Sequence, residues 1–267
     1  MYVRIILFGF VISLLFNSNL FSYDRYSISE SIGDYHAGCV KKSIELPNGG
    51  SGYQIIRPSR KRYYGNQITI DYIRKLSRKF NKKYKSNILI ADISKKGGGP
   101  IPYEHSSHQT GLDADILLFH KENYIELYTR EEREELEPNS VLDETKKKID
   151  FSKWEELNGE LLKTAANYSE VNRIFINPAI KKHLCNRYEN ESWLKKLRPW
   201  WGHDGHFHVR LKCPDNNHKC VDQKNPGHIE CGEELDFWLS DEAFAKRKRE
   251  RAKPRRKKAL RLPPECR

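Results

Sequence analysis

A short run of alternating residues in the C-terminal third constrains the fold of this chain more than any other feature. The run extends from His206 to Leu211 and reads His-Phe-His-Val-Arg-Leu. Residues two apart in a strand point the same way, so we expect His206, His208 and Arg210 to share one face and the apolar residues between them to pack in the core. Imidazole is the commonest biological ligand for zinc and also carries protons near neutral pH. One strand can therefore supply a metal ligand and a base.

A second cluster, residues 105–115, has complementary chemistry and reads His-Ser-Ser-His-Gln-Thr-Gly-Leu-Asp-Ala-Asp. Gly111 permits a turn, and the alternation after it predicts a half-buried strand. Together with His208, the residues His108 and Asp115 form a set of two imidazoles and one carboxylate, which leaves the fourth tetrahedral position of a zinc ion open, as in catalytic sites. A single His-Xaa-His is more often a surface or packed pair, but the two clusters together favour a zinc site.

The N-terminal residues predict export. One positive charge at Arg4 precedes an apolar run from Ile5 to Phe16 that contains no charge. This run is too short for a membrane-spanning helix, which needs about 20 apolar residues, and it fits a cleavable signal peptide over residues 1–22. An uncleaved anchor is the alternative. We expect no transmembrane span elsewhere.

Six cysteines in an exported chain predict disulfide bonds, because oxidising compartments retain them. They are Cys39, Cys185, Cys213, Cys220, Cys231 and Cys266. The absence of a Cys-Xaa-Xaa-Cys pair argues against a zinc ribbon or a redox motif, and the residues themselves leave all 15 pairings open. A bond between Cys39 and Cys266 would tie the two ends of the mature chain together.

The positive charge is concentrated at the C-terminus. Of the net +12, the segment from Lys246 to Arg261 contributes eleven Lys or Arg against one Glu. The length predicts one folded domain over residues 23–245, followed by a basic tail over residues 246–267 that would be tied back through Cys266. The tail would attract anionic envelope polymers or nucleic acid. A disordered, solvated tail is the commoner outcome for such runs, and export disfavours nucleic acid as a partner.

Hydrophobic periodicity predicts helices over residues 68–80 and 154–167 and a buried strand over residues 87–93. Residues 122–148 read as a charged surface insertion near the site, with residues 131–137 helical. The expected fold class is α/β (α+β): a mainly antiparallel central sheet has helices on one side and a zinc cleft on the other.

Several blocks of the sequence resemble the penicillin-insensitive murein endopeptidases, periplasmic zinc peptidoglycan hydrolases of Gram-negative bacteria. The blocks are residues 33–47, 56–65, 105–115, 173–181, 193–200 and 203–214. The resemblance runs from about Gly33 to Trp238 and returns at Cys266. It implies a periplasmic zinc peptidase with an α/β core.

The resemblance also implies roles for individual residues. A Ser-x-His-x-x-Gly-x-Ala-x-Asp pattern begins at Ser106, with Asp113 in the place of its Ala. The metal ligands that it implies are His108, Asp115 and His208, and His105 matches a further histidine that has been treated as a ligand. The implied catalytic residues are His206 as base and His203, which lines the site. The implied disulfides pair Cys39 with Cys266, Cys185 with Cys231, and Cys213 with Cys220.

The implied reaction is hydrolysis of D-alanyl to meso-diaminopimelyl crosslinks, with peptidoglycan stem peptides as partners and Zn²⁺ as cofactor. Trp200, Trp201 and Arg210 are candidates for lining the cleft, although tryptophans also pack in cores and Arg210 could pair with Asp113. Some relatives have a second metal site, which is doubtful here because no histidine lies between His120 and His183. The alternatives are a catalytically inactive zinc-containing wall-binding protein and, more remotely, a secreted basic nuclease.

Overall fold

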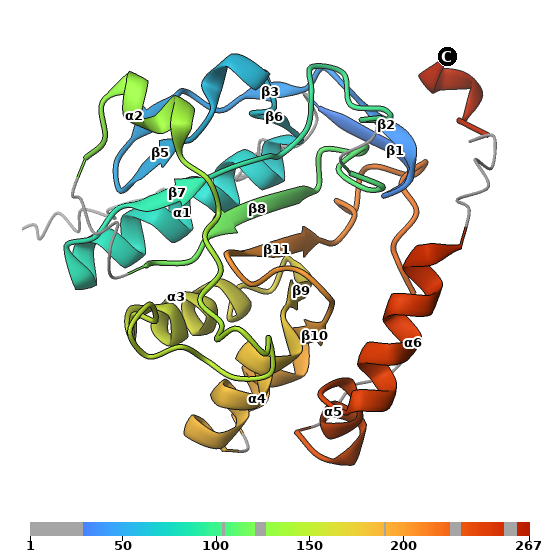
Figure 1. Cartoon of the computed structure of the whole chain (residues 1–267). Helices are drawn as coiled ribbons and strands as arrows, with labels where there is room; N and C mark the ends of the chain where they lie inside the picture. Colours follow the sequence, from blue (N-terminus) through green and yellow to red (C-terminus); the bar gives the residue numbers. More distant parts are fainter. Residues whose placement is uncertain (1–28, 103–104, 121–126, 190, 225–230, 254–260) are drawn as a thin grey trace, which may run out of the picture.

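The computed structural model describes residues 29–102, 105–120, 127–189, 191–224, 231–253 and 261–267 (Figure 1). The predicted signal peptide, residues 1–22, lies outside the described residues, as does part of the basic tail, residues 254–260. No helix in the described ranges is both long and apolar enough to span a bilayer.

A seven-stranded sheet forms the centre of the molecule (Figure 1). In spatial order its strands are β10 (Leu197–Pro199), β9 (Val171–Ile176), β11 (His206–Leu211), β8 (Asp113–Leu117), β7 (Ile88–Ile90), β5 (Tyr53–Ile55) and β4 (Gly49–Gly50). Neighbouring strands are antiparallel except for the β10–β9 and β5–β7 pairs. Two small antiparallel pairs accompany the sheet, β1 (Glu30–Asp34) with β2 (Ala37–Lys41) and β3 (Ile44–Glu45) with β6 (Tyr64–Gly65). The expected mainly antiparallel α/β fold is confirmed.

The helices of the described residues are α1 (Gln67–Tyr84), α2 (Arg130–Glu135), α3 (Leu157–Ala166), α4 (Pro178–Arg187), α5 (Glu233–Trp238) and α6 (Asp241–Ala252), with 3₁₀ turns at Pro58–Arg60, Ser192–Lys196 and Pro264–Cys266. The predictions over residues 68–80, 131–137 and 154–167 correspond to α1, α2 and α3. The predicted strand over residues 87–93 is shorter, since β7 ends at Ile90; beyond it, backbone hydrogen bonds between Ala91, Asp92 and Asp115 hold the chain beside the site.

The two faces of the central strands have opposite chemistry. Phe207 and Val209 of β11 are fully buried in one core with Ile116 of β8 and with apolar residues of α1, α3 and α4. His208 and Arg210 lie on the other face, as the alternation predicts. The expectation that β8 is half-buried is wrong, because all five of its residues are buried. Its polar face lies beneath a cluster of ionisable side chains rather than in water.

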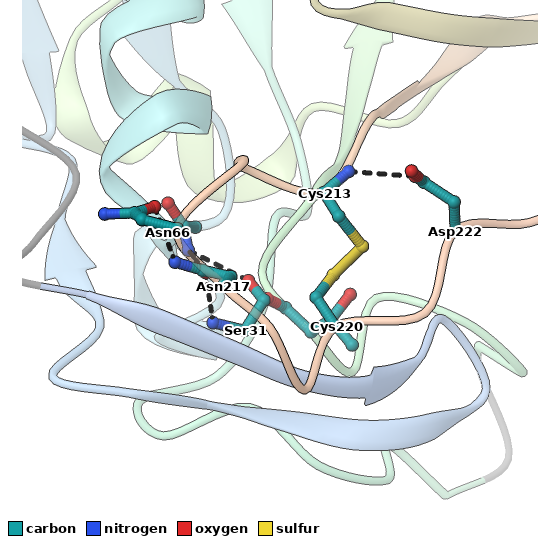
Figure 2. The surroundings of a disulfide bond; sticks show 8 residues. Ser31, Asn66, Cys213, Asn217, Cys220 and Asp222 are labelled. Carbon is teal, nitrogen blue, oxygen red and sulfur yellow. Dashed lines mark hydrogen bonds between the residues drawn. A yellow bond between two sulfur atoms is a disulfide. The ribbon is translucent and has the colours of Figure 1, made fainter.

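Three disulfide bonds join Cys39 to Cys266, Cys185 to Cys231, and Cys213 to Cys220. These are the pairings that the family resemblance implies. The Cys213–Cys220 bond closes a loop whose Asn217 side chain accepts hydrogen bonds from the Ser31 backbone N–H (2.7 Å) and from Asn66 Nδ2 (3.1 Å) (Figure 2). Asn66 caps α1 by accepting from the Ile68 N–H (3.2 Å). The disulfide loop therefore fixes the start of α1.

The first part of the basic tail is helical. The expectation of a disordered run is wrong for residues 246–252, which belong to α6. Aromatic contacts hold this helix: the Phe244 ring lies 4.8 Å from that of Trp201, and the Arg247 guanidinium lies 4.7 Å from the same indole. Trp201 thus packs against α6, whereas Trp200 is 54% exposed.

Candidate metal centre

The two histidine clusters meet because β8 and β11 are neighbours. Their antiparallel register places His208 opposite Asp115. Nδ1 of His208 lies 3.4 Å from Oδ1 of Asp115, and Nε2 of His108 lies 3.4 Å from Oδ2 of the same carboxylate. The His108 and His208 rings are 4.6 Å apart. The structure therefore brings together the three side chains expected to hold the metal.

The backbone around His108 fixes the direction of its ring. His108 adopts a positive φ of 65°, and its N–H donates to Oδ2 of Asp113 (2.9 Å). Its Nδ1 lies 2.7 Å from the Ile93 carbonyl oxygen. A carbonyl oxygen only accepts, so Nδ1 carries a proton and Nε2 is the ring atom that faces Asp115. Gly111, with φ 69°, completes the turn and its carbonyl accepts from the Thr69 hydroxyl of α1 (2.7 Å).

Asp113 lies beneath the site and is fully buried. Its Oδ1 accepts from Nε2 of His208 (2.8 Å) and from Nε of Arg210 (2.7 Å). Arg210 thus pairs with Asp113, one of the alternatives that the sequence leaves open. The bond to His208 places the proton on Nε2 and leaves the Nδ1 lone pair directed at Asp115. Carboxylates commonly orient metal-binding histidines in this way.

The ionisation of these groups differs across the site. Burial lowers the pKa of His108, but the Asp115 carboxylate outweighs it and raises the pKa to about 9. Burial lowers the pKa of His208 to about 4 and that of His203 to about 3. Burial opposes ionisation of Asp115, yet His108 holds the pKa of that carboxyl well below its ordinary value. Without a metal ion, Asp115 therefore favours the protonated form of His108, whereas burial keeps His208 and His203 neutral.

Three buried atoms at this site have no hydrogen-bond partner among the described residues: Nδ1 of His203 and the pair formed by Nε2 of His108 and Oδ1 of Asp115. Buried polar atoms are nearly always satisfied by protein or ordered solvent, so such a pair points to a missing ligand. His105, His108 and Asp115 offer ligand atoms that all lie within 4.8 Å of one another. Nitrogen and carboxylate donors in this number suit zinc. The residues present fit a metal ion.

His105 pairs with Asp92, a contact that the sequence analysis did not predict. Its Nε2 lies 2.7 Å from Oδ2 of Asp92 and 4.0 Å from Oδ2 of Asp115. Asp92 also contacts Arg60 (3.0 Å) and Arg62 (3.2 Å), and it is 5% exposed. The only signal in the sequence was one acidic residue inside an otherwise apolar predicted strand.

His203 lies on the turn that leads into β11, and His206 is the first residue of that strand. Nε2 of His206 is 4.0 Å from Oδ1 of Asp115, and its side chain is 26% exposed. The His203 ring is 5.0 Å from that of His206 and 6.0 Å from that of His208. Asn177, the N-cap of α4, donates from its backbone to the His203 carbonyl (3.0 Å). The five predicted histidines therefore gather around Asp115, with four of them within 4.0 Å of its carboxylate and His203 behind His206 and His208.

A cavity of about 590 Å³ opens beside this centre. Its lining includes Asp115 and His206 from the predicted site, together with Arg57, Arg60 and Pro138. Pro138 belongs to the charged insertion, which therefore lies at the site as expected. The two arginines lie in the block of residues 56–65 that resembles the family, but the sequence assigned them no role at the site.

A buried cluster of imidazoles and a carboxylate beside an open cavity is the arrangement typical of metal-dependent hydrolases. The family model of the penicillin-insensitive murein endopeptidases matches residues 31–267. Proteins of that name from Yersinia enterocolitica and Klebsiella pneumoniae are 36% and 37% identical to this chain over 239 and 243 residues, which cover 89% of it in each case and 84% and 85% of the relatives. The Haemophilus influenzae protein of the same name is 39% identical over 214 residues, 78% of this chain and 72% of its own. The chain belongs to the penicillin-insensitive murein endopeptidase family.

Proposed function

We propose that this protein is a zinc-dependent endopeptidase that hydrolyses D-alanyl to meso-diaminopimelyl crosslinks in peptidoglycan. The observation that carries the proposal is the pair of unsatisfied buried atoms, His108 Nε2 and Asp115 Oδ1, beside an open cavity. Relatives that match most of this chain are named murein endopeptidases. Three disulfides and the predicted signal peptide support action in the periplasm.

The proposed ligands are Nε2 of His108, the Asp115 carboxylate and Nδ1 of His208. When bound, zinc supplies Lewis acidity toward water and toward a carbonyl oxygen. His105 lies close enough to approach the same ion, but its bond to Asp92 (2.7 Å) favours a supporting position. Asp113 keeps His208 in the tautomer that offers Nδ1.

His206 is the proposed general base. It lines the cavity and is partly exposed, so it can reach a water molecule beside the carboxylate that the metal would share. It would take a proton from the attacking water and return it to the departing amine, which is the usual dual role of a catalytic histidine. His203 beside it has a pKa of about 3 and stays neutral, so it does not compete for that proton.

The proposal accounts for insensitivity to penicillin without further assumptions. Beta-lactams acylate an active-site serine, and none of the proposed catalytic groups is a serine. Ser106 and Ser107 lie in the bend that precedes His108 and receive no chemical role. The net charge at the centre, with neutral imidazoles and one carboxylate around a divalent cation, suits a substrate that carries carboxylates.

The test is incubation of the purified protein with a crosslinked dimeric muropeptide, with zinc or with a chelator, and identification of the products by mass. We expect monomers only when zinc is present. His206→Ala should bind zinc and release no monomers, whereas the matched variant of an exposed histidine, His218→Ala, should behave as the wild type. Turnover by His206→Ala would remove His206 from the mechanism. Binding to sacculi without release of soluble muropeptides would favour the wall-binding alternative.

A further inference from the structure

A strained turn on the cavity rim presents Arg57. This residue adopts φ 47° and ψ 53°, in the left-handed region, directly before Pro58, and Lys61 after the turn adopts φ 51°. Such conformations are uncommon for residues other than glycine, and they gather at functional sites. The Arg57 N–H donates to the Arg133 carbonyl (2.8 Å), which holds the turn against α2. Arg57 and Arg60, the residues before and within the turn, both line the cavity.

The two arginines differ in how firmly they are paired. Arg60 lies 3.0 Å from Asp92, a buried carboxylate that also binds Arg62 and His105. Arg57 instead pairs through Nη1 with Glu137 (3.1 Å), whose side chain is 68% exposed. Exposed ion pairs are weak, so a competing carboxylate can displace Glu137. The Arg57 Nε has no hydrogen-bond partner among the described residues. Arg57 is thus the arginine of this cavity that can change its partner.

We propose that Arg57 forms a carboxylate-binding subsite that recognises the carboxylate next to the scissile bond. The inference rests on the proposed function, because it names a substrate group for the same cavity. In the crosslink, the diaminopimelate carbon that bears the scissile nitrogen also bears a carboxylate, so this anion must lie close to the metal centre during cleavage. The planar guanidinium binds a carboxylate in a bidentate manner. The substrate carboxylate exchanges with Glu137 and orients the leaving amine.

The experiment compares two synthetic crosslinked peptides that differ at this one group, which is a free carboxylate in one and a carboxamide in the other. We expect the wild-type protein with zinc to prefer the free acid. In Arg57→Gln, kcat/KM for the free acid should fall about 10- to 100-fold, mainly through KM, because a hydrogen bond to a charged group is lost. Activity on the carboxamide should change little, so the preference disappears. Arg57→Lys should restore part of it.

Two control variants test whether the preference for the free acid depends on Arg57 itself. Arg60→Gln removes the same charge from the same cavity and should retain the preference for the free acid. Glu137→Gln removes the competing partner and should lower KM for the free acid while the preference stays. Retention of the wild-type preference by Arg57→Gln, or equal loss of it in Arg60→Gln, overturns the subsite alone. Cleavage of neither peptide by the wild type rejects the proposed function and the subsite with it.

Discussion

The floor and the rim of the cavity are built on different principles. We define the floor as His108, Asp113, Asp115 and His208, which are at most 5% exposed. The rim residues His206 and Arg57 are 26% and 19% exposed in their side chains, and Arg57 pairs with a carboxylate in water. Floor side chains are fixed by bonds to buried partners, so their geometry is set before a ligand arrives. Rim side chains can exchange partners. Under the proposed function, the floor would hold the ion and the rim would contact the substrate.

Removal of a floor ligand should have the largest effect. Asp115→Ala deletes the carboxylate between His108 and His208, and we expect loss of bound zinc together with a fall in kcat/KM of at least about a thousandfold. Zinc content by atomic spectroscopy and muropeptide turnover measure the two effects. The rim variant His206→Ala should lose comparable activity with its zinc retained. Loss of zinc from both variants would contradict the proposal that the floor binds the metal and the rim does not.

The Asp113 carboxylate holds the His208 ring and the Arg210 guanidinium in place within the floor. Asp113→Asn keeps the shape of the side chain but leaves the buried Arg210 guanidinium without its counterion. We expect zinc affinity to fall about 10- to 100-fold and stability to fall by about 3 kcal/mol. Competition with a chromogenic chelator and urea unfolding measure these changes. Asp241→Asn, at a side chain that is 97% exposed, is the matched control and should leave both values near those of the wild type. Unchanged zinc affinity in Asp113→Asn would show that Asp113 does not position His208.

The neutral His203 makes a smaller, pH-dependent contribution. Burial lowers its pKa in the folded state to about 3, whereas the unfolded chain has the ordinary value near 6.5. As the pH falls below 6.5, His203 binds a proton in the unfolded state but not in the folded state. The free energy of unfolding therefore decreases between about pH 6.5 and pH 3. Urea unfolding of the metal-free protein across this range should show a shallower acid loss in His203→Phe. An identical pH profile in the variant would contradict the assignment.

The smallest effect is expected at Glu134, which contacts the turn that carries the rim residue Arg57. Glu134 of α2 contacts the Ser59 backbone and hydroxyl, but these contacts are exposed to solvent. We expect Glu134→Gln to change the free energy of unfolding by less than about 1 kcal/mol and to leave zinc affinity unchanged. Thermal unfolding and chelator competition are the measurements. A change comparable to that of Asp113→Asn would mean that the insertion is part of the rigid floor.

The floor could be predicted from the sequence because alternation determines which residues share a strand face. In β11 and β8 the polar residues, among them His208 and Asp115, lie on one face. The apolar residues that alternate with them lie on the other face, as expected. The rim could not be predicted in the same way. The Asp92–His105 pair depends on a contact between separate loops, and the position of Arg57 depends on a left-handed backbone that no local pattern specifies. The helical start of the basic tail likewise depends on tertiary contacts with Trp201.

The central claim is that three side chains from two strands and one loop bind a single divalent ion. Anomalous diffraction at the zinc edge from crystals of the zinc-loaded protein tests it most directly. We predict one peak within bonding distance of His108 Nε2, the Asp115 carboxylate and His208 Nδ1, about 2.0 to 2.2 Å from each. A zinc-loaded crystal with no peak there, or with a peak that any of the three fails to contact, would contradict it.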